Sequence, residues 1–251
     1  MKVLAIGNSF SQDATRYLHQ VAKAAGVDMK VMNLCIGGCS LKKHYDNMRT
    51  DATAYALEYN GEKLNVFVSI RNALVSDDWD VITLQQVSSL SFDKESYEPY
   101  LPSLAEYVRF LRPNAKLCLH QTWFYEDGSE KLAHTPYATS ADMLRDIKAA
   151  YSYAADLIGA DLIIPSAEAF EYLYSNGCGK IHRDTFHASL GIGRYTLALT
   201  WLEALTGISA IDNGFRDFDL PMSEDEISLC RSAAHYAVGK AGKLISDFTE
   251  K

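Results

Sequence analysis

The feature that most constrains the fold of this chain is a regular alternation of short apolar runs and longer segments of helical periodicity. The apolar runs predict strands at residues 2–6, 30–36, 81–85, 116–122 and 162–165. Helical periodicity follows in residues 11–25, 97–111, 141–158 and 190–205. Ser223 and Glu226 form a capping-box pattern, which predicts a last helix that runs towards Phe248. Strands that are apolar on both faces are typical of a parallel sheet covered by helices on each side.

The alternation therefore predicts an α/β fold, a flavodoxin-like three-layer sandwich with a central parallel sheet. Residues 54–69 depart from it, because two alternating segments flank Asn60-Gly61, a pair that favours a type I′ turn. We expect an inserted β-hairpin there, either at the edge of the sheet or overhanging the site. The chain has 251 residues, 48% of them hydrophobic, so residues 1–251 are predicted to form a single domain.

Charge and cysteine usage argue against several classes of function. The formal net charge is −8 and the basic residues are scattered, so no nucleic-acid partner is expected. The five cysteines show no paired CxxC spacing, which favours a reducing compartment over a disulfide framework. No apolar run approaches the roughly 20 residues that cross a bilayer, so no membrane partner is expected. We expect a cytoplasmic protein without metal or cofactor, and leave open an export signal outside these residues and the oligomeric state.

Small polar residues and glycines follow the predicted strands, at the edge where open α/β sheets place their working groups. The stretch Gly7-Asn8-Ser9-Phe10-Ser11 leaves the first strand and enters a helix, whose N-terminus favours a developing anion. Gly37 and Gly38 follow the second strand, where backbone N–H groups can approach a substrate oxygen closely. Gln86 and Ser89 follow the third strand and supply amide and hydroxyl donors.

Two further segments carry candidate site residues. Gln121 and Trp123 belong to a polar-to-aromatic run after the fourth strand, which suits the grip of a ligand. Asp184 lies three residues before His187, a spacing that lets the carboxylate orient the imidazole. Ser9 alone is a weak nucleophile and needs such a base within hydrogen-bond reach.

Each of these features also has a structural interpretation. Ser9 could be only a helix N-cap, and Gly37-Gly38 only a turn. Asp184 and His187 could be a helix cap and a surface histidine, and aromatic residues such as Trp123 are more often packing residues. Their co-occurrence at one predicted sheet edge favours the catalytic interpretation over these separate ones.

The pattern resembles the SGNH, or GDSL-like, hydrolase superfamily over essentially the whole chain. The first block of that superfamily is similar to Gly7-Asn8-Ser9-Phe10-Ser11, and its last block, D-x-x-H, is similar to residues 184–187. The phrases LQQ, QTW and DTFHAS resemble an uncharacterised bacterial branch of it, described as a domain of unknown function. The resemblance implies that Ser9 is the nucleophile, His187 the general base and Asp184 its orienting partner.

The resemblance also implies an oxyanion hole, in which the sequence departs from the family pattern. The backbone N–H groups of Ser9 and of Gly38, with Gly37 as the alternative, would form part of it. The third block of the superfamily supplies an asparagine, but this chain has neither Gly nor Asn in residues 84–89. Gln86 is expected to take its place, with Ser89 as the second possibility. Losing one such donor without replacement lowers the rate by about 10²–10³.

The first functional hypothesis is a serine esterase that removes a small acyl group, such as acetyl, from a carbohydrate or similar small polar molecule. The second is a flavodoxin-like module that binds a phosphate or nucleotide at the first helix N-terminus. The third is a catalytically weak or inactive SGNH-fold protein that binds carbohydrate. The joint pattern of Ser9, Asp184 and His187 favours the esterase, because neither binding hypothesis gives these residues a joint role.

Overall fold

The structure is a computed structural model that describes residues 1–242, and its centre is a seven-stranded sheet. Along the sheet the strands are ordered β4-β3-β2-β1-β5-β6-β7. Their bounds are β1 Lys2–Gly7, β2 Lys30–Cys35, β3 Tyr55–Tyr59, β4 Glu62–Val68, β5 Val81–Leu84, β6 Lys116–His120 and β7 Leu162–Ile164. The neighbours β2, β1, β5, β6 and β7 pair in parallel, and the β3–β4 hairpin extends the sheet through antiparallel pairings. The predicted α/β fold with a central, mostly parallel sheet is confirmed.

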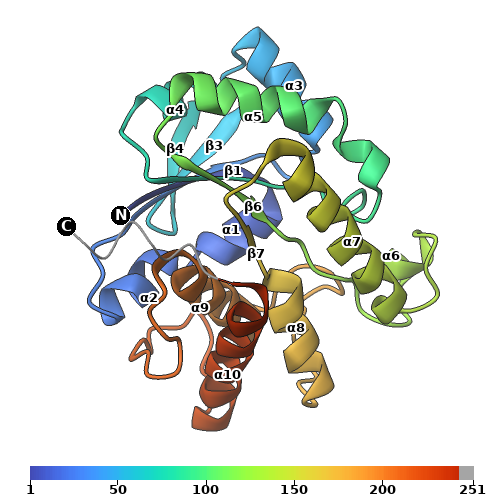
Figure 1. Cartoon of the computed structure of the whole chain (residues 1–251). Coiled ribbons are helices and arrows are strands. Elements are labelled where there is room, and N and C mark those ends of the chain that lie inside the picture. The colour runs from blue at the N-terminus through green and yellow to red at the C-terminus, as the bar shows by residue number, and fades with distance from the viewer. Residues whose placement is uncertain (243–251) are drawn as a thin grey trace.

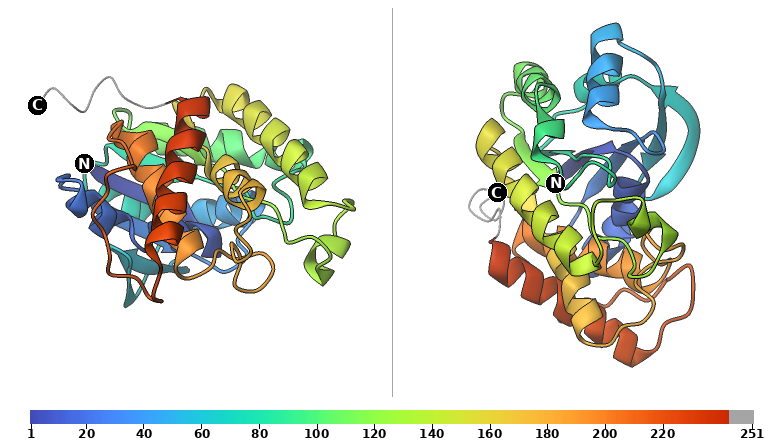
Figure 2. Two further views of the ribbon diagram at one scale, coloured as in Figure 1. Left: turned by 90° about the horizontal axis from the view of Figure 1, so that it is seen from below. Right: turned by 90° about the vertical axis from the view of Figure 1, so that its right-hand side faces the viewer.

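Helices cover both faces of the sheet (Figure 1). One layer holds α1 Ser9–Thr15, α2 Leu18–Ala24, α8 Ser166–Ser175, α9 Ile192–Thr206 and α10 Glu224–Ala241. The other layer holds α3 Leu41–Thr50, α4 Ile70–Val75, α5 Tyr100–Leu111 and α7 Ser140–Ile158. The 3₁₀ helix η1 Lys94–Tyr97 and the short helix α6 Glu130–Ala133 lie in connections between these elements. Figure 2 shows α9 and α10 side by side, on the side of the sheet away from α5.

The predicted hairpin is present and lies at the sheet edge, the first of the two expected placements. Asn60 and Gly61 have φ angles of 52° and 86°, as a two-residue type I′ turn requires. A Cβ atom added to Gly61 would lie 2.1 Å from the carbonyl oxygen of Arg16. The hairpin turn therefore packs directly on the junction between α1 and α2.

The helix predicted for residues 11–25 is divided in two at this junction. The hydroxyl of Tyr17 donates to the carbonyl of Leu190 at 2.7 Å and accepts from the N–H of Asp219 at 2.7 Å. These partners lie far along the chain, so the break depends on tertiary contacts that the local periodicity does not contain. The capping box of Ser223 and Glu226 begins α10 as predicted, and the predicted end towards Phe248 lies outside the described residues.

The packing against the sheet explains the apolar runs. The side chains of β1 from Val3 to Ile6 are at most 1% exposed, because helices cover both faces of that strand. In α9, every residue from Tyr195 to Thr206 is buried, so this helix forms the centre of its layer. Within residues 1–242, no helix is both long and apolar enough to cross a bilayer.

Candidate active site

Ser9 is held at the point where β1 ends and α1 begins. Asn8 caps α1, because its side-chain oxygen accepts from the N–H of Phe10 at 3.0 Å. The chain turns tightly here: a Cβ atom on Gly7 would lie 2.6 Å from Oγ of Ser11 and 2.9 Å from the side chain of Gln85. Only glycine fits at position 7, so the sequence of this loop places the hydroxyl of Ser9 above the carboxyl edge of the sheet.

A hydrogen-bonded chain joins Ser9 to the loop that precedes α9. The Nε2 atom of His187 lies 2.8 Å from Oγ of Ser9, and its Nδ1 atom lies 2.8 Å from Oδ2 of Asp184. The other carboxylate oxygen of Asp184 accepts from the backbone N–H of His187 at 2.9 Å. The structure therefore brings together the three residues that the sequence singled out, with His187 between a hydroxyl and a carboxylate.

The carboxylate determines which nitrogen of His187 carries the proton. Burial alone would raise the pKa of Asp184, but the hydrogen bonds from His187 hold that pKa below its ordinary value. An ionised carboxylate only accepts, so Nδ1 of a neutral His187 must be the donor to Asp184. Its Nε2 atom is then free to accept the proton of the Ser9 hydroxyl.

Buried interactions hold the loop around His187 in place. The guanidinium of Arg183 lies 2.8 Å from Oδ2 of Asp13, a fully buried carboxylate on α1 that also binds Arg194 at 2.9 Å. Thr185 has a φ of 73°, a left-handed conformation that is costly for a β-branched residue. Such strain persists only where the surroundings enforce it, and the ion pairs of Asp13 provide that constraint across 170 residues of sequence.

Residues with free backbone N–H groups line the cavity that contains the Ser9 hydroxyl. Ile36 and Cys39 close a turn with a hydrogen bond of 3.1 Å, in which Gly38 has a φ of 64°. Within residues 1–242, the N–H groups of Ser9, Gly37 and Gly38 donate to no backbone carbonyl. All three residues line the cavity, and free backbone N–H groups are the kind of donor that stabilises a negatively charged oxygen.

The cavity has a volume of about 390 Å³ and a mixed lining. Hydroxyl groups come from Ser9, Ser88, Ser89 and Tyr125, and apolar surface comes from the residues Phe10, Val87 and Phe186. Ser89, one of the predicted donors, is exposed there, while Oγ of Ser88 lies 2.8 Å from the hydroxyl of Tyr125. Lys131 also lines the cavity, and no motif in the sequence indicated it.

The predicted role of Gln86 as the oxyanion donor is wrong. Its side-chain nitrogen donates to the carbonyl and to the hydroxyl of Ser96, both at 3.0 Å. Its side-chain oxygen accepts from the N–H of Leu41 at 2.9 Å, at the start of α3. Gln86 does not line the cavity, and its amide nitrogen is occupied by Ser96. It therefore joins two loops and has no donor left for a substrate.

Gln121 and Trp123 were predicted to contact the substrate, and the structure contradicts this too. The side-chain oxygen of Gln121 accepts from the N–H of Ala167 at 3.1 Å, and Gln121 is only 3% exposed. The indole of Trp123 stacks on Phe10 at 4.1 Å and donates to the carbonyl of Phe186 at 2.8 Å. Neither residue lines the cavity, and the hydrogen bond from Trp123 to Phe186 supports the loop that carries His187.

A buried polar network supports the first two loops, and the sequence interpretation missed it. Gln85 donates to the side-chain oxygen of Asn8 at 2.8 Å, and Asn8 donates to the carbonyl of Cys39 at 3.0 Å. The other end of the Gln85 amide lies 2.8 Å from Nδ1 of His120. Burial lowers the pKa of His120 to about 3, so its imidazole is neutral, with Nδ1 donating to Gln85. The second glutamine of the LQQ stretch therefore anchors a loop, and the first orients Asn8.

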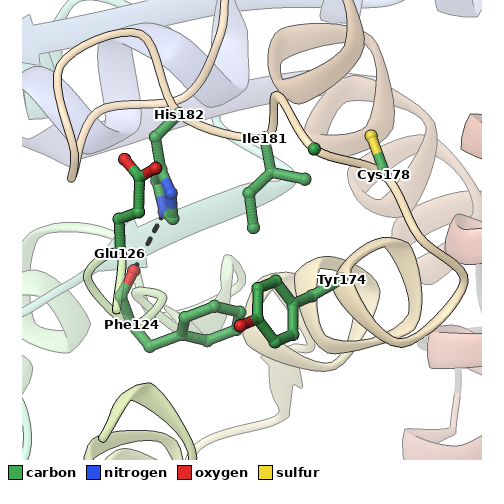
Figure 3. A pocket seen from close by; sticks show the side chains of 7 residues that line it. Phe124, Glu126, Tyr174, Cys178, Ile181 and His182 are labelled. Carbon is green, nitrogen blue, oxygen red and sulfur yellow. Dashed lines mark hydrogen bonds between the residues drawn. The ribbon is translucent and has the colours of Figure 1, made fainter. Parts of the chain in front are cut away.

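A second, smaller cavity of about 60 Å³ lies beside the His187 loop and shares no lining residue with the first (Figure 3). It contains Cys178 and His182, residue types that can form a nucleophile and a base. Burial raises the pKa of Cys178 and lowers the pKa of His182 to about 4. Nε2 of His182 also lies 3.0 Å from the carbonyl of Phe124, so neither side chain is activated for catalysis.

Metal ligation is a separate possibility for the histidines and carboxylates. Among residues 1–242, no group of three or more His, Cys, Asp or Glu side chains is placed to hold a metal ion. His44 and His120 are instead fully buried, and both have pKa values lowered to about 3 by burial.

Comparisons with known proteins agree with this architecture. A family described as a domain of unknown function, DUF4886, matches residues 2–237. The chain is similar to a DUF4886 family protein from Bacteroides uniformis ATCC 8492, whose crystal structure is known. The two sequences are 37% identical, and the structural match includes 100% of this chain and 98% of that one, with a TM-score of 0.89. Among curated proteins, no sequence matches the chain.

More distant likenesses concern the fold alone. A protein from Slackia heliotrinireducens, provisionally assigned as an SGNH hydrolase, has 23% identity and a TM-score of 0.61. The likeness covers 81% of this chain and 97% of that one. A member of the lipolytic G-D-S-L family from Veillonella parvula DSM 2008 has 12% identity and a TM-score of 0.52, over 81% of this chain and 97% of that one. The chain therefore belongs to the DUF4886 family, and its fold is that of the SGNH hydrolases.

Proposed function

We propose that this protein is a serine hydrolase that removes a small acyl group, such as acetyl, from a polar, carbohydrate-like ester. The observation that carries the proposal is the hydrogen-bonded chain from Ser9 through His187 to Asp184, at the wall of an accessible cavity. An SGNH-type fold, which is found among esterase- and lipase-like hydrolases, supports the same reaction class.

The acylation step uses the groups already in place. Oγ of Ser9 attacks the ester carbonyl carbon while Nε2 of His187 takes the hydroxyl proton. The negative charge that develops on the carbonyl oxygen is stabilised by the free N–H groups of Ser9 and Gly38. When the tetrahedral intermediate collapses, the bond to the alcohol breaks and His187 returns the proton to the leaving oxygen.

Deacylation repeats these roles with water as the nucleophile. His187 takes a proton from water, and the resulting attack on the acyl-enzyme forms a second tetrahedral intermediate. Collapse of this intermediate releases the carboxylic acid and returns the proton to Oγ of Ser9. Asp184 stabilises the imidazolium in both steps and stays ionised throughout.

The lining of the cavity supports a small polar substrate. Hydroxyls of Ser88, Ser89 and Tyr125 offer hydrogen bonds, and Phe10 and Val87 offer apolar surface. This mixture suits a sugar ring, which combines hydroxyl groups with an apolar C–H face. A volume of about 390 Å³ accommodates a small acylated sugar better than a long acyl chain.

The two binding hypotheses remain as outcomes of a test. A phosphate bound at the start of α1 leaves the hydrogen-bonded pair of His187 and Asp184 without a role. A carbohydrate-binding protein without activity needs no hydroxyl bound to an oriented histidine. The hydrogen bond between Ser9 and His187 therefore favours the enzyme.

Fluorophosphonate labelling tests the proposal without knowledge of the substrate. We expect a single adduct, which intact mass and peptide mapping place on Ser9 and which is lost in His187→Ala. Ser228→Ala, which removes an exposed hydroxyl on α10, is the matched control and should label like the unaltered protein.

The alternative outcomes are equally clear. No adduct on a protein shown to be folded by circular dichroism would overturn the proposal and favour a binding protein. Equal labelling of the unaltered protein and His187→Ala would mean that His187 does not activate Ser9.

A further inference from the structure

Lys131 places a cation in the wall of the Ser9 cavity. It lies on α6, in the connection between β6 and α7, and its side chain is half-buried. Its Nζ atom is 4.5 Å from the ring centroid of Phe186 and 5.8 Å from that of Tyr125. Both rings line the same cavity, so the ammonium group stands over the surface on which a substrate would rest.

The cation has no carboxylate partner in the part of the chain that the structure describes, residues 1–242. None of the acidic side chains nearest along the chain forms an ion pair with Lys131. Glu126 lines the smaller cavity, and Asp127 binds the hydroxyls of Ser140 and Tyr174 at 2.8 and 2.9 Å. Glu130 is exposed to solvent.

The charge of the cavity is opposite to that of the whole chain. None of the residues that line it is Asp or Glu, and Lys131 is the lining residue with a permanent positive charge. The formal net charge of the protein is −8, so most of its surface repels an anionic ligand. A neutral ligand would not need a cation such as Lys131 in the cavity. A cation without a carboxylate partner in the lining of the Ser9 cavity provides local attraction for a negatively charged ligand.

We infer that the ester accepted by this site carries an anionic group, a carboxylate or an equivalent charge, that Lys131 binds while Ser9 attacks the ester carbonyl. The inference rests on the proposed hydrolase activity, whose substrate class it narrows from polar esters to acidic ones. The charge could belong to the alcohol, as in an acetylated uronate, or to the acyl group, as in a half-ester of a dicarboxylic acid. In both cases Lys131 contributes to specificity and takes no part in the proton transfers.

The first experiment compares two fluorophosphonate probes that differ by one terminal carboxylate. The unaltered protein should react at Ser9 about 10–100-fold faster with the anionic probe at low salt, since one charge-assisted contact is made or lost. Lys131→Met should abolish this preference and leave the neutral probe within about threefold. Lys131→Arg should retain it, and 0.5 M NaCl should weaken it in both. Lys23→Met removes an exposed charge on α2 and is the matched control.

The second experiment locates the charge in the substrate. One pair of esters is an acetylated galacturonate and its methyl ester, and the other is 4-nitrophenyl succinate and its methyl ester. Lys131→Met should raise KM for the acidic member of one pair with little change in kcat, and the pair affected identifies the side that carries the charge.

The same experiments distinguish a failure of the proposed role of Lys131 from a failure of the proposed hydrolase activity. Equal reactivity of both probes in the unaltered protein, or equal losses for both in Lys131→Met, would overturn the role of Lys131 and leave the hydrolase intact. If neither probe labels Ser9, the hydrolase proposal fails, and titration of galacturonate against its methyl ester then tests the anion site by itself. Equal affinity for the two sugars would overturn it.

Discussion

The Nε2 atom of His187 lies 2.8 Å from Oγ of Ser9, although 178 positions separate the two residues in the chain. The contact joins the end of β1 to the loop before α9, and Asp184 holds the imidazole from the other side at 2.8 Å. The proposed mechanism requires Ser9, His187 and Asp184 to act as a unit, and substitutions at the three positions test this.

Ser9→Ala and His187→Ala should each lower kcat by about 10⁴–10⁶, because each removes a member of one proton-transfer unit. The double variant should lose little more than either single variant. Steady-state turnover of a hydrolysed ester, measured for all four proteins, checks this. Losses that multiply in the double variant would contradict a joint mechanism.

Asp184→Asn should lower kcat by about 10⁴, since an amide can donate to Nδ1 and so favour the wrong tautomer of His187. Because the hydrogen bonds from His187 hold the pKa of Asp184 below its ordinary value, the carboxylate stays ionised in mild acid, so the loss should be as large at pH 5 as at pH 7. Measuring kcat of both proteins at the two pH values checks this. A loss that disappears at pH 5 would oppose the role of an ionised Asp184.

Gln86→Ala should lower the free energy of unfolding by about 1–3 kcal/mol, because the N–H of Leu41 and the hydroxyl of Ser96 lose a buried partner. Its kcat should change by less than tenfold, whereas a lost oxyanion donor costs about 10²–10³. Urea unfolding and kcat on the same sample distinguish the two roles. A thousandfold loss of kcat without loss of stability would restore Gln86 as a donor.

Gln85→Ala is the companion variant, and it should affect kcat more than Gln86→Ala does. It removes the hydrogen bond at 2.8 Å to Asn8, the residue that caps α1 beneath Ser9 and binds the carbonyl of Cys39. The free N–H groups of the cavity depend on these loops, so we expect a loss of about 10–100-fold from misplaced donors. Equal effects of the two variants on kcat would argue against this positioning role.

The buried imidazoles should make stability fall in mild acid. His44 and His120 have pKa values lowered to about 3 by burial, against about 6.5 in an unfolded chain. Between these pH values the unfolded state binds more protons, so the free energy of unfolding decreases as the pH falls below about 6.5. Each of the two histidines lowers the free energy of unfolding by up to about 1.4 kcal/mol for each pH unit of acidification in this range.

Urea unfolding at pH 7 and pH 5 measures this dependence. His44→Gln keeps a polar side chain near Tyr55 but cannot titrate, so its stability should change less between the two pH values. An exposed histidine, His134, provides the control: His134→Gln should keep the slope of the unaltered protein. If His44→Gln also leaves the slope unchanged, His44 does not contribute to it.

Local sequence patterns were sufficient to predict the parallel strands, the hairpin turn and the cap of α10. Strand runs that are apolar on both faces, a glycine that tolerates positive φ and a serine that caps a helix act through neighbours in the chain. The same local reasoning failed at Arg16 and Tyr17, where contacts with Gly61, Leu190 and Asp219 divide the predicted helix. Helix α3 was not predicted, because two of the three residues on its buried face, His44 and Asn47, are polar and do not register in a pattern of apolar residues.

For the candidate site, the residue types and spacing of Ser9, Asp184 and His187 were enough to single these three residues out, because together they point to one chemistry. The orientation of the amides and of the cation depends on contacts between loops that are distant in the chain. Gln85, Gln86 and Gln121 carry the same group, and their burial and partners in other loops settle which contacts each one makes. Lys131 enters the cavity through a connection folded back over Phe186, and such proximity depends on long-range packing that no local pattern records.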